Sequence, residues 1–457
     1  MKAAGVPPLF AFVRRLAFVG LVILVAPALW VTIAASAGPG SDVSASARKA
    51  PTPRVLEEVP ATSNSLAAAQ AHNSAMLAAD PTEPRFVVMA SRLDAPDFSC
   101  ELHLSGDGGR GWVPANPVPR LPKGAEKCYG PEVAFDRRGK LYYLFVGLVG
   151  RGNEPMGAFL TTSSDRGRTF TAPRKILGPF NFQVRMAIER DFGSRGRIHL
   201  VWLKASGDPG LGSMPPPPNP IMAAHSDDGG KTFSKPVQVS DLKRDRVVAP
   251  ALALGPSGGI HVLYYDLGDD ARDYNGLEGP VWEGKWSLVA TSSAGGRGFA
   301  RGVVVDDAIA PPERMMLIFT MPPPSEAAGP DGRLFAAWHD ARNGDWDVFL
   351  SVSKDNGRSW TGPRRLNDDP VGNGRNQYLP RLSVSSAGRL DAIFYDRRDD
   401  PSNIRNNVYY TYSSNSMSSF SPNLRLTRKA SDTRSGQRYQ GAAAAGLVDF
   451  GARIALL

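Results

Sequence analysis

The stretch from Ala336 to Pro363, AAWHDARNGDWDVFLSVSKDNGRSWTGP, decides the fold. In and just before it lie two short runs rich in apolar and aromatic residues, Leu334 to His339 and Asp347 to Val352. Such runs, separated here by Asn343-Gly344, are typical of two β-strands joined by a turn. The sequence therefore predicts a β-hairpin.

An eight-residue motif follows this hairpin: Ser353-x-Asp355-x-Gly357-x-Ser359-Trp360. An Asp carboxylate can accept hydrogen bonds from backbone N–H groups of its own turn. Gly357 can take the positive φ that such a turn needs at no steric cost. Trp360 offers a large apolar surface with which the hairpin can pack against a neighbouring sheet. We call this motif the octet.

The octet recurs along the chain. Full copies begin at Ser163 and Ser226, and the copy at Ser105 lacks only the hydroxyl residue before the aromatic residue. More degenerate copies begin at Ser292 and Ser413. Successive copies are 58, 63, 66, 61 and 60 residues apart. This near-constant period indicates an internal repeat.

The octets resemble the Asp-box, or bacterial neuraminidase repeat, of the sialidase-like superfamily, whose members are β-propellers. The resemblance covers roughly residues 65 to 457. It implies an all-β propeller of six four-stranded blades, with the octets between the third and fourth strands of a blade, on the face opposite the ligand site. It also implies that the octet aspartates are structural: Asp107, Asp165, Asp228 and Asp355.

Each repeat predicts four strands, with the octet before a short fourth one. Radial sheets of this kind leave only short, protected edges. We expect the first strands to begin near Ser74, Glu132, Val184, Pro250, Met315 and Pro380. The insertions Pro209 to Pro220 and Pro322 to Pro330 are rich in proline and are predicted to be loops. Tyr439 to Leu457 look like the first two strands of another repeat, so seven blades in a truncated chain remain the alternative to six.

The chain has 457 residues, 42% of them hydrophobic, and can bury a large core. Residues 1–37 form a targeting segment, because Arg14-Arg15 precede an apolar stretch that ends in Ala35-Ser36-Ala37. The stretch is also about long enough to span a bilayer. A cleaved signal peptide and a retained anchor both remain open, and either one predicts export, to a secreted, periplasmic or anchored protein. Residues 38–62 are expected to be a flexible linker, and residues 63–457 the propeller.

Composition argues against several partners. The net charge is +9, but the sequence lacks the clustered basic runs with interleaved aromatics that nucleic-acid binding predicts. The acidic group around Asp266 fails the spacing of a calcium loop, because Ala271 and Trp282 stand where ligands are needed. We therefore expect no nucleic acid, no metal and no cofactor, and contact with a membrane only through an uncleaved N-terminal segment.

Three loops after second strands share a pattern of aromatic residue, Asp and nearby Arg. An Arg fork binds carboxylates or sulfates, and a neighbouring Asp can hold the fork in place. These loops predict either a repeated structural Asp–Arg pair or a site for an anionic or polyhydroxyl ligand. The residues concerned are Asp266, Arg272, Asp340, Arg342, Asp396, Arg397 and Arg398.

The resemblance does not carry the catalytic residues over. Family enzymes use three arginines on the substrate carboxylate, a tyrosine nucleophile assisted by a glutamate, and an aspartate. The first arginine usually stands on the first strand of the first blade, where this chain has Ser74 to Asp80 without arginine. Tyr439 lies late in the chain, as the nucleophile would, but its surroundings do not identify it. Two function classes remain open: a sialidase-like glycoside hydrolase, or a non-catalytic propeller that binds a glycan, a peptide or a cell-surface partner.

Cys100 and Cys128 are the only cysteines. Export places them in an oxidising compartment, and both are expected on the loop-rich face of neighbouring blades. We predict a disulfide between them.

Overall fold

The computed structural model describes residues 55, 58–61, 72–93, 98–116, 119–150, 154–193, 196–205, 217–268, 270, 284–310, 323–414 and 418–432. All of these belong to a compact unit, Val55–Leu457, and none to the other unit, Met1–Arg54. The targeting segment, most of the linker, Arg272 and the expected extra strands of Tyr439 to Leu457 lie outside them. Within these ranges no helix is long and apolar enough to cross a membrane.

The described residues form six antiparallel sheets, here blades one to six. Blade one is β1 (His72–Asp80), β2 (Glu83–Leu93), β3 (Ser99–Ser105) and β4 (Val113–Pro114). Blade two is β5 (Lys127–Phe135), β6 (Leu141–Val149), β7 (Glu154–Ser163) and β8 (Arg174–Leu177). Blade three is β9 (Asn181–Glu189), β10 (Arg197–Lys204), β11 (Ile221–Ser226) and β12 (Val237–Gln238). Blade four is β13 (Val247–Leu254), β14 (Gly259–Asp266), β15 (Trp286–Ala294) and β16 (Val303–Ile309). Blade five is β17 (Ser325–Ala328), β18 (Leu334–Asp340), β19 (Asp347–Ser353) and β20 (Arg364–Arg365). Blade six is β21 (Gln377–Val384), β22 (Leu390–Asp396), β23 (Arg405–Ser413) and β24 (Leu424–Arg425), and the short β25 (Ser431–Asp432) also pairs with β23.

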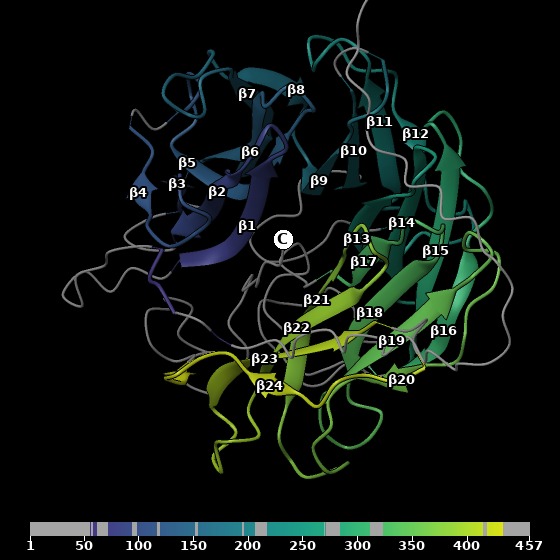
Figure 1. The fold of residues 1–457 in the computed structure, drawn as a ribbon. Helices are drawn as coiled ribbons and strands as arrows, with labels where there is room; N and C mark the ends of the chain where they lie inside the picture. Colours follow the sequence, from purple (N-terminus) through teal and green to yellow (C-terminus); the bar gives the residue numbers. More distant parts are fainter. Residues whose placement is uncertain are drawn as a thin grey trace, which may run out of the picture. The chain divides into compact units, whose positions relative to one another are not determined.

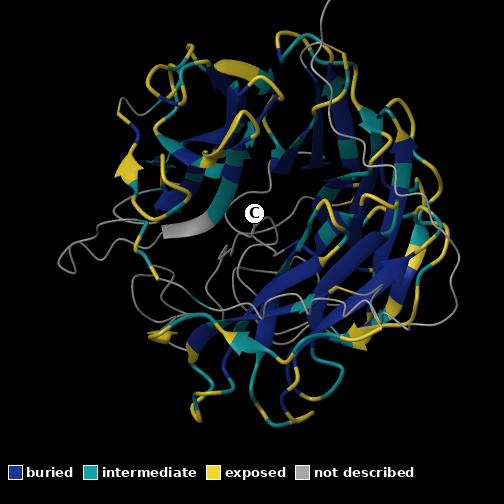
Figure 2. Ribbon diagram, viewed as in Figure 1, coloured by how far each residue is buried: buried dark blue, intermediate teal, exposed yellow. Residues whose placement is uncertain are grey.

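The predicted fold is confirmed as an all-β propeller of six four-stranded blades. In every sheet the strands pair in chain order, and the first strands of successive blades contact one another, from β1 to β5 and onward to β21. The sheets follow each other around a common centre (Figure 1). Burial is greatest along the middle strands, whereas the connecting turns are exposed (Figure 2). This is the arrangement that packs apolar strand faces between neighbouring blades.

All first strands except β17 begin earlier than the sequence indicates. β5, β13 and β21 start at Lys127, Val247 and Gln377. They therefore include Pro131, which precedes the expected start of β5, and Pro250 and Pro380, which were the expected starts of β13 and β21. Each of these strands has a shift in its pairing register just before or at the proline. Because a first strand pairs on one side only, a residue without an N–H is tolerated there at a bulge.

The prediction that Pro322 to Pro330 is a loop is wrong. Within it lies β17, which pairs with β18 from Ser325 with Ala337 to Ala328 with Leu334. The four paired residues contain no proline, and the prolines only flank them. This strand also replaces the start expected near Met315, which lies outside the described residues.

The octets form the expected turns on their own hydrogen bonds. In the second copy, Ser163 Oγ donates to Asp165 Oδ1 at 2.7 Å, and Thr169 donates to Asp165 through both its N–H and its Oγ1, at 2.9 and 2.6 Å. Gly167 lies at a φ of 82° and donates its N–H to Ser163 Oγ. The copies at Ser226 and Ser353 repeat these contacts. The octet aromatics Phe170, Phe233, Phe299, Trp360 and Phe420 pack against the hydrophobic clusters between blades.

The predicted disulfide is confirmed. Cys100 in β3 and Cys128 in β5 are bonded with their Cα atoms 5.5 Å apart, so the bridge joins blade one to blade two. Cys128 lies inside β5, not before the strand as expected, because β5 starts at Lys127.

Candidate functional site

The predicted Asp–Arg loops bridge neighbouring blades. Arg342 donates to both oxygens of Asp340 at the end of its own second strand, and its third nitrogen donates to Asp306 in β16 at 2.9 Å. β16 is the outermost strand of the preceding blade. Burial raises the pKa of Asp340, and the Arg342 guanidinium acts against that rise. Arg342 is therefore held between blades four and five.

Two further loops repeat this bridge. Arg398 donates to Asp396 at 2.8 Å and reaches Asp368, which follows the outermost strand of blade five. Asp266 accepts a hydrogen bond from Arg244, which comes from the segment between blades three and four. The structure thus brings each of these charged groups to a blade boundary, and among the described residues no ion pair or hydrogen bond joins the groups of different loops.

Arg397 differs from the other predicted residues. It is 2% exposed and lies over the ring of Tyr378, with its Cζ 5.2 Å from the ring centroid. Its Nε donates to Asn406 at 2.9 Å and one terminal nitrogen donates to the Asn403 carbonyl at 2.7 Å. Arg397 thus belongs to the interior of blade six. The part that these residues play in ligand binding remains a prediction.

A second group of polar residues occupies equivalent positions on the first strands. Gly130, Gln183, Ala249 and Leu379 all have a positive φ, between 51° and 57°. In each of these four first strands, the residue two positions later pairs with a residue in the middle of the second strand. In the two other blades, Met76 and Ser325 are the first-strand residues with the equivalent pairing. We call the resulting ring the axial layer: Met76, Glu132, Arg185, Ala251, Ser325 and Arg381.

An ion pair fixes one side of the axial layer. Arg185 donates to Glu132 Oε1 at 2.8 Å and through its Nε to the Pro250 carbonyl at 3.2 Å. Both charged side chains are buried, at 10% and 3% exposure. Arg185 is therefore anchored on blade two and blade four at once, and its charge is matched by Glu132.

Arg381 faces this pair from another part of the ring. It belongs to blade six, yet the charges of Arg185 in blade three and Glu132 in blade two act on it. Blade six adjoins neither of these blades in chain order, so Arg381 lies within electrostatic reach of charges from two blades that are not its neighbours in the chain. Burial and the nearby Arg185 lower the pKa of Arg381 to about 10, with Glu132 acting against them, which leaves it charged at neutral pH. Within the described ranges its guanidinium makes no ion pair or hydrogen bond.

Small side chains stand next to the axial layer. Two residues further along each first strand, the residues are Ala78, Ala134, Ala187, Ala253, Ala327 and Ser383. Successive side chains of a strand alternate between its faces, so this second ring lies on the same face as the axial layer. Two of its members, Ala134 and Ala187, line a cavity.

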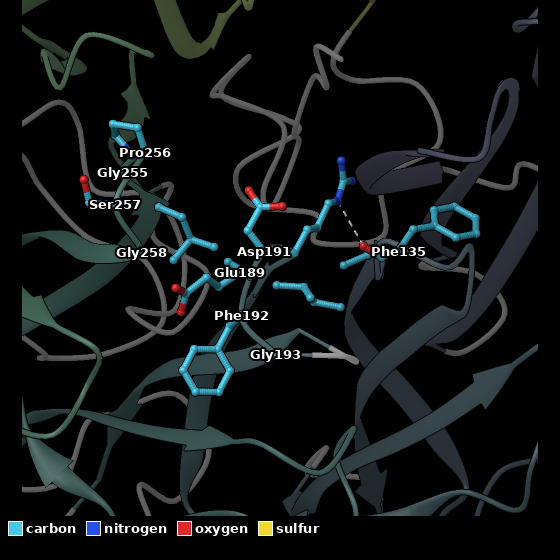
Figure 3. Close-up of a pocket in the computed structure, with 14 residues that line it drawn as sticks. Phe135, Glu189, Asp191, Phe192, Gly193, Gly255, Pro256, Ser257 and Gly258 are labelled. Atoms are coloured by element: carbon cyan, nitrogen blue, oxygen red, sulfur yellow. Dashed lines mark hydrogen bonds between the residues drawn. The ribbon is translucent and has the colours of Figure 1, made fainter. Parts of the chain in front are cut away.

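This cavity has a volume of about 680 Å³ (Figure 3). Its walls are the ends of β5, β9 and β13 with the turns that follow β9 and β13. The Glu189 carboxylate lies close to Gly258, where a Cβ would stand 1.9 Å from Glu189 Oε1 and would displace the carboxylate, and the φ of 74° at Gly258 favours glycine. Both residues line the cavity (Figure 3). Burial raises the pKa of Glu189, whose Oε2 lies 3.3 Å from His199 Nε2. Arg190 donates to the Phe135 carbonyl. With Asp191, the cavity offers two carboxylates as hydrogen-bond acceptors for a polar ligand.

The sequence reading missed the axial residues Glu132, Arg185 and Arg381. A signal was present in three repeats, where Gly130-Pro131-Glu132, Ala249-Pro250-Ala251 and Leu379-Pro380-Arg381 share a proline before the axial position. Aligning the repeats on that proline would have placed a Glu and an Arg on equivalent first strands.

No protein-family model and no curated protein matches this chain. Solved structures with a similar arrangement include a protein of unknown function from Dyadobacter fermentans, with 14% identity, a TM-score of 0.48 and coverage of 75% of this chain and 94% of that one. An ulvan lyase of a polysaccharide lyase family shares 11% identity over 79% and 87% of the two chains, with a TM-score of 0.48. The intramolecular trans-sialidase from Ruminococcus gnavus shares 10% identity over 71% and 90%, with a TM-score of 0.45. Likenesses of this degree leave the function to be argued from the site.

Proposed function

We propose that this chain is an exported sialidase-like β-propeller that binds an anionic glycan at its axis. The observation that carries the proposal is Arg381, a charged guanidinium on the first strand of blade six that has no ion-pair or hydrogen-bond partner in the described part of the chain. A guanidinium presents a planar fork that matches carboxylate and sulfate groups. An acidic sugar would supply such a group.

The charge balance of the axial layer supports this ligand. Glu132 is matched by Arg185 at 2.8 Å, so one positive charge remains uncompensated in a ring that is otherwise neutral. Placing a charge among protein atoms is costly unless it is paired. An anion at the axis would lower that cost, and the Glu132–Arg185 pair would accept and donate hydrogen bonds to the sugar hydroxyls.

Export is proposed on the N-terminal sequence, and the octets are assigned to the Asp-box repeat on their spacing and their turn contacts. Catalysis is a separate matter. The sialidase residues cannot be carried over one by one, so a non-catalytic glycan-binding propeller is the alternative to a glycoside hydrolase. Turnover of a glycoside separates the two.

The test compares purified wild type with Arg381→Ala and with Arg358→Ala, a matched exposed arginine in an octet. We expect wild type to bind uronate-, sialate- or sulfate-bearing glycans on an array. Arg381→Ala should weaken binding about 10- to 150-fold, the equivalent of a charge-assisted hydrogen bond of about 1.5–3 kcal/mol. Because Arg381 has no partner to lose, its variant should melt no lower than wild type.

Fluorogenic glycosides, including a sialoside, are assayed in the same preparations. Turnover that Arg381→Ala lowers and Arg358→Ala leaves intact assigns a hydrolase, and binding without turnover assigns the non-catalytic class. The proposal is refuted if no anionic glycan is retained or if Arg381→Ala binds as wild type does.

A further inference from the structure

Two adjoining pockets lie on the octet side of blades one to three, away from the axial layer. The first, of about 330 Å³, is lined by Asp80, Arg138, Arg166 and Arg168 among others. The second, of about 430 Å³, is lined by Asp136, Arg138, Lys140, Asp228 and Lys231 among others. Arg138 and Ser164 belong to both, so the two pockets form one continuous surface, which we call the paired pocket.

The carboxylates of the paired pocket are already engaged. Asp80 accepts hydrogen bonds from Thr82 N, Thr82 Oγ1 and Arg166 Nε at 2.8, 2.6 and 3.0 Å. Asp136 Oδ1 accepts from the backbone N–H groups of Arg138 and Lys140 at 2.9 and 3.0 Å.

The two octet aspartates of the paired pocket are engaged in the same way. Asp165 and Asp228 each accept three hydrogen bonds within their octets. Every acidic side chain of the paired pocket therefore already accepts hydrogen bonds from its own turn, and Asp80 accepts one more from Arg166.

The cations of the paired pocket include three without partners. Arg166 is bound to Asp80, and Lys140 lies over the Tyr142 ring at 5.2 Å. By contrast, the side chains of Arg138, Arg168 and Lys231 are exposed and make no ion pair or hydrogen bond within the described ranges. Five cationic side chains stand against four carboxylates, and the unpaired groups are all positive.

We propose that the paired pocket binds two successive oxyanion groups, sulfate or phosphate, of a linear polyanion. Arg138 stands between the two pockets and can contact both groups, while Arg168 serves the first pocket and Lys231 the second. A guanidinium fork binds a tetrahedral oxyanion through two parallel N–H···O bonds, and an ammonium binds it as a point charge. The proposal does not depend on the axial site, because it uses residues of turns and none of the first-strand ring.

The repeat provides an internal control for this proposal. The sixth residue of the octet is basic in five copies: Arg110, Arg168, Lys231, Arg297 and Arg358. All five are exposed. Only Arg168 and Lys231 line the paired pocket, so Arg297 and Arg358 carry the same charge at the same position of a turn without its walls.

The test uses the full chain with three probes: dextran sulfate, polyphosphate and uncharged dextran. Affinities are measured by titration calorimetry at several NaCl concentrations, because exposed charge contacts weaken as salt screens them. We expect dextran sulfate, polyphosphate or both to bind, and uncharged dextran not to bind. The polyanion with the higher affinity identifies the preferred oxyanion as sulfate or phosphate. The double variant Arg138→Ala/Arg168→Ala should lose at least tenfold in affinity, and Arg297→Ala/Arg358→Ala should stay within twofold.

A second double variant, Arg138→Lys/Arg168→Lys, keeps the charge and removes the fork, so we expect an intermediate loss. Thermal midpoints equal to that of wild type are expected for all these variants, since the replaced side chains are exposed. The proposal is overturned if neither polyanion binds, if uncharged dextran binds equally well, or if the two alanine pairs weaken binding to the same extent. The last result would assign the binding to general surface charge.

Discussion

Replacing Arg342 by alanine distinguishes a structural bridge from a ligand contact. In the folded protein this side chain joins Asp340, which is fully buried, to Asp306 of the preceding blade. The variant leaves both carboxylates in place and removes the four charge-assisted hydrogen bonds that the guanidinium donates to them. Asp340 keeps two weaker donors, the Trp338 Nε1 at 2.9 Å and the backbone N–H of residue 342 at 3.0 Å.

The magnitude follows from what is left unpaired. Removing one partner of a buried ion pair costs about 3–5 kcal/mol because the other charge stays buried. The two donors that Asp340 retains place the expected loss at the lower end, about 3 kcal/mol. With an unfolding entropy of about 2.1 cal/mol/K per residue, a domain of roughly 400 residues would lose about 3–4 °C in its melting temperature.

The assay is thermal and urea unfolding of wild type, Arg342→Ala and the exposed control Arg358→Ala, together with ligand affinity. Burial already raises the pKa of Asp340, and Arg342 opposes that rise. Without Arg342 the carboxyl should bind a proton at higher pH, so the stability difference from wild type should shrink as the solution is acidified. Equal melting of Arg342→Ala and wild type, with lost ligand affinity, would refute the bridge and make Arg342 a ligand contact.

Three further predictions follow from single contacts. Asp165→Ala and Asp228→Ala should destabilise the fold without changing ligand preference. Hydrogen bonding lowers the pKa of Asp165 to about 2, from an ordinary value of 3.8, so its contribution to stability should be full above about pH 4 and lost as the pH falls to about 2. Urea unfolding across that pH range measures this contribution. Reducing the Cys100–Cys128 disulfide, which closes a loop with a sequence separation of 28 residues, should lower the free energy of unfolding by about 3–4 kcal/mol according to the chain-entropy relation. A reduced protein that melts like the oxidised one would contradict this. Glu326→Gln should raise the melting temperature at neutral pH. Burial raises the pKa of Glu326 well above its ordinary value, so ionisation of this group favours the unfolded state as the pH rises above about 4.5. The gain in melting temperature should therefore vanish below that pH.

The octets made the fold predictable from the sequence. Their turns are stabilised by hydrogen bonds within eight residues, such as Ser163 with Asp165, and so leave a local pattern in the sequence. Their six copies correspond to the six blades of the structure. The two errors concern first strands, β17 and the starts marked by proline, because these strands pair on one side only and tolerate residues that a central strand excludes.

The candidate site was less predictable because it depends on contacts between distant repeats. The pattern of aromatic residue, Asp and Arg is visible in sequence, and it has a local explanation in the Asp340–Arg342 bridge. By contrast, Glu132, Arg185 and Arg381 are 53 and 196 residues apart along the chain, and no local pattern joins them. They come near one another only because the repeats fold into blades around a common centre.

Under the proposed function, the axial layer gives one fold a position at which the ligand can differ. Each first strand has a free edge towards the axis, so a bulge can be accommodated there without breaking a pair of central strands. The positive φ at Gly130, Gln183, Ala249 and Leu379 marks that bulge and sets the side chain two residues later. The position is therefore fixed by the backbone, whereas the residue is free to be Glu, Arg, Ala, Ser or Met. Binding chemistry can change there without altering the octets that hold the blades, and this separation is why the repeat identifies the fold and not the ligand.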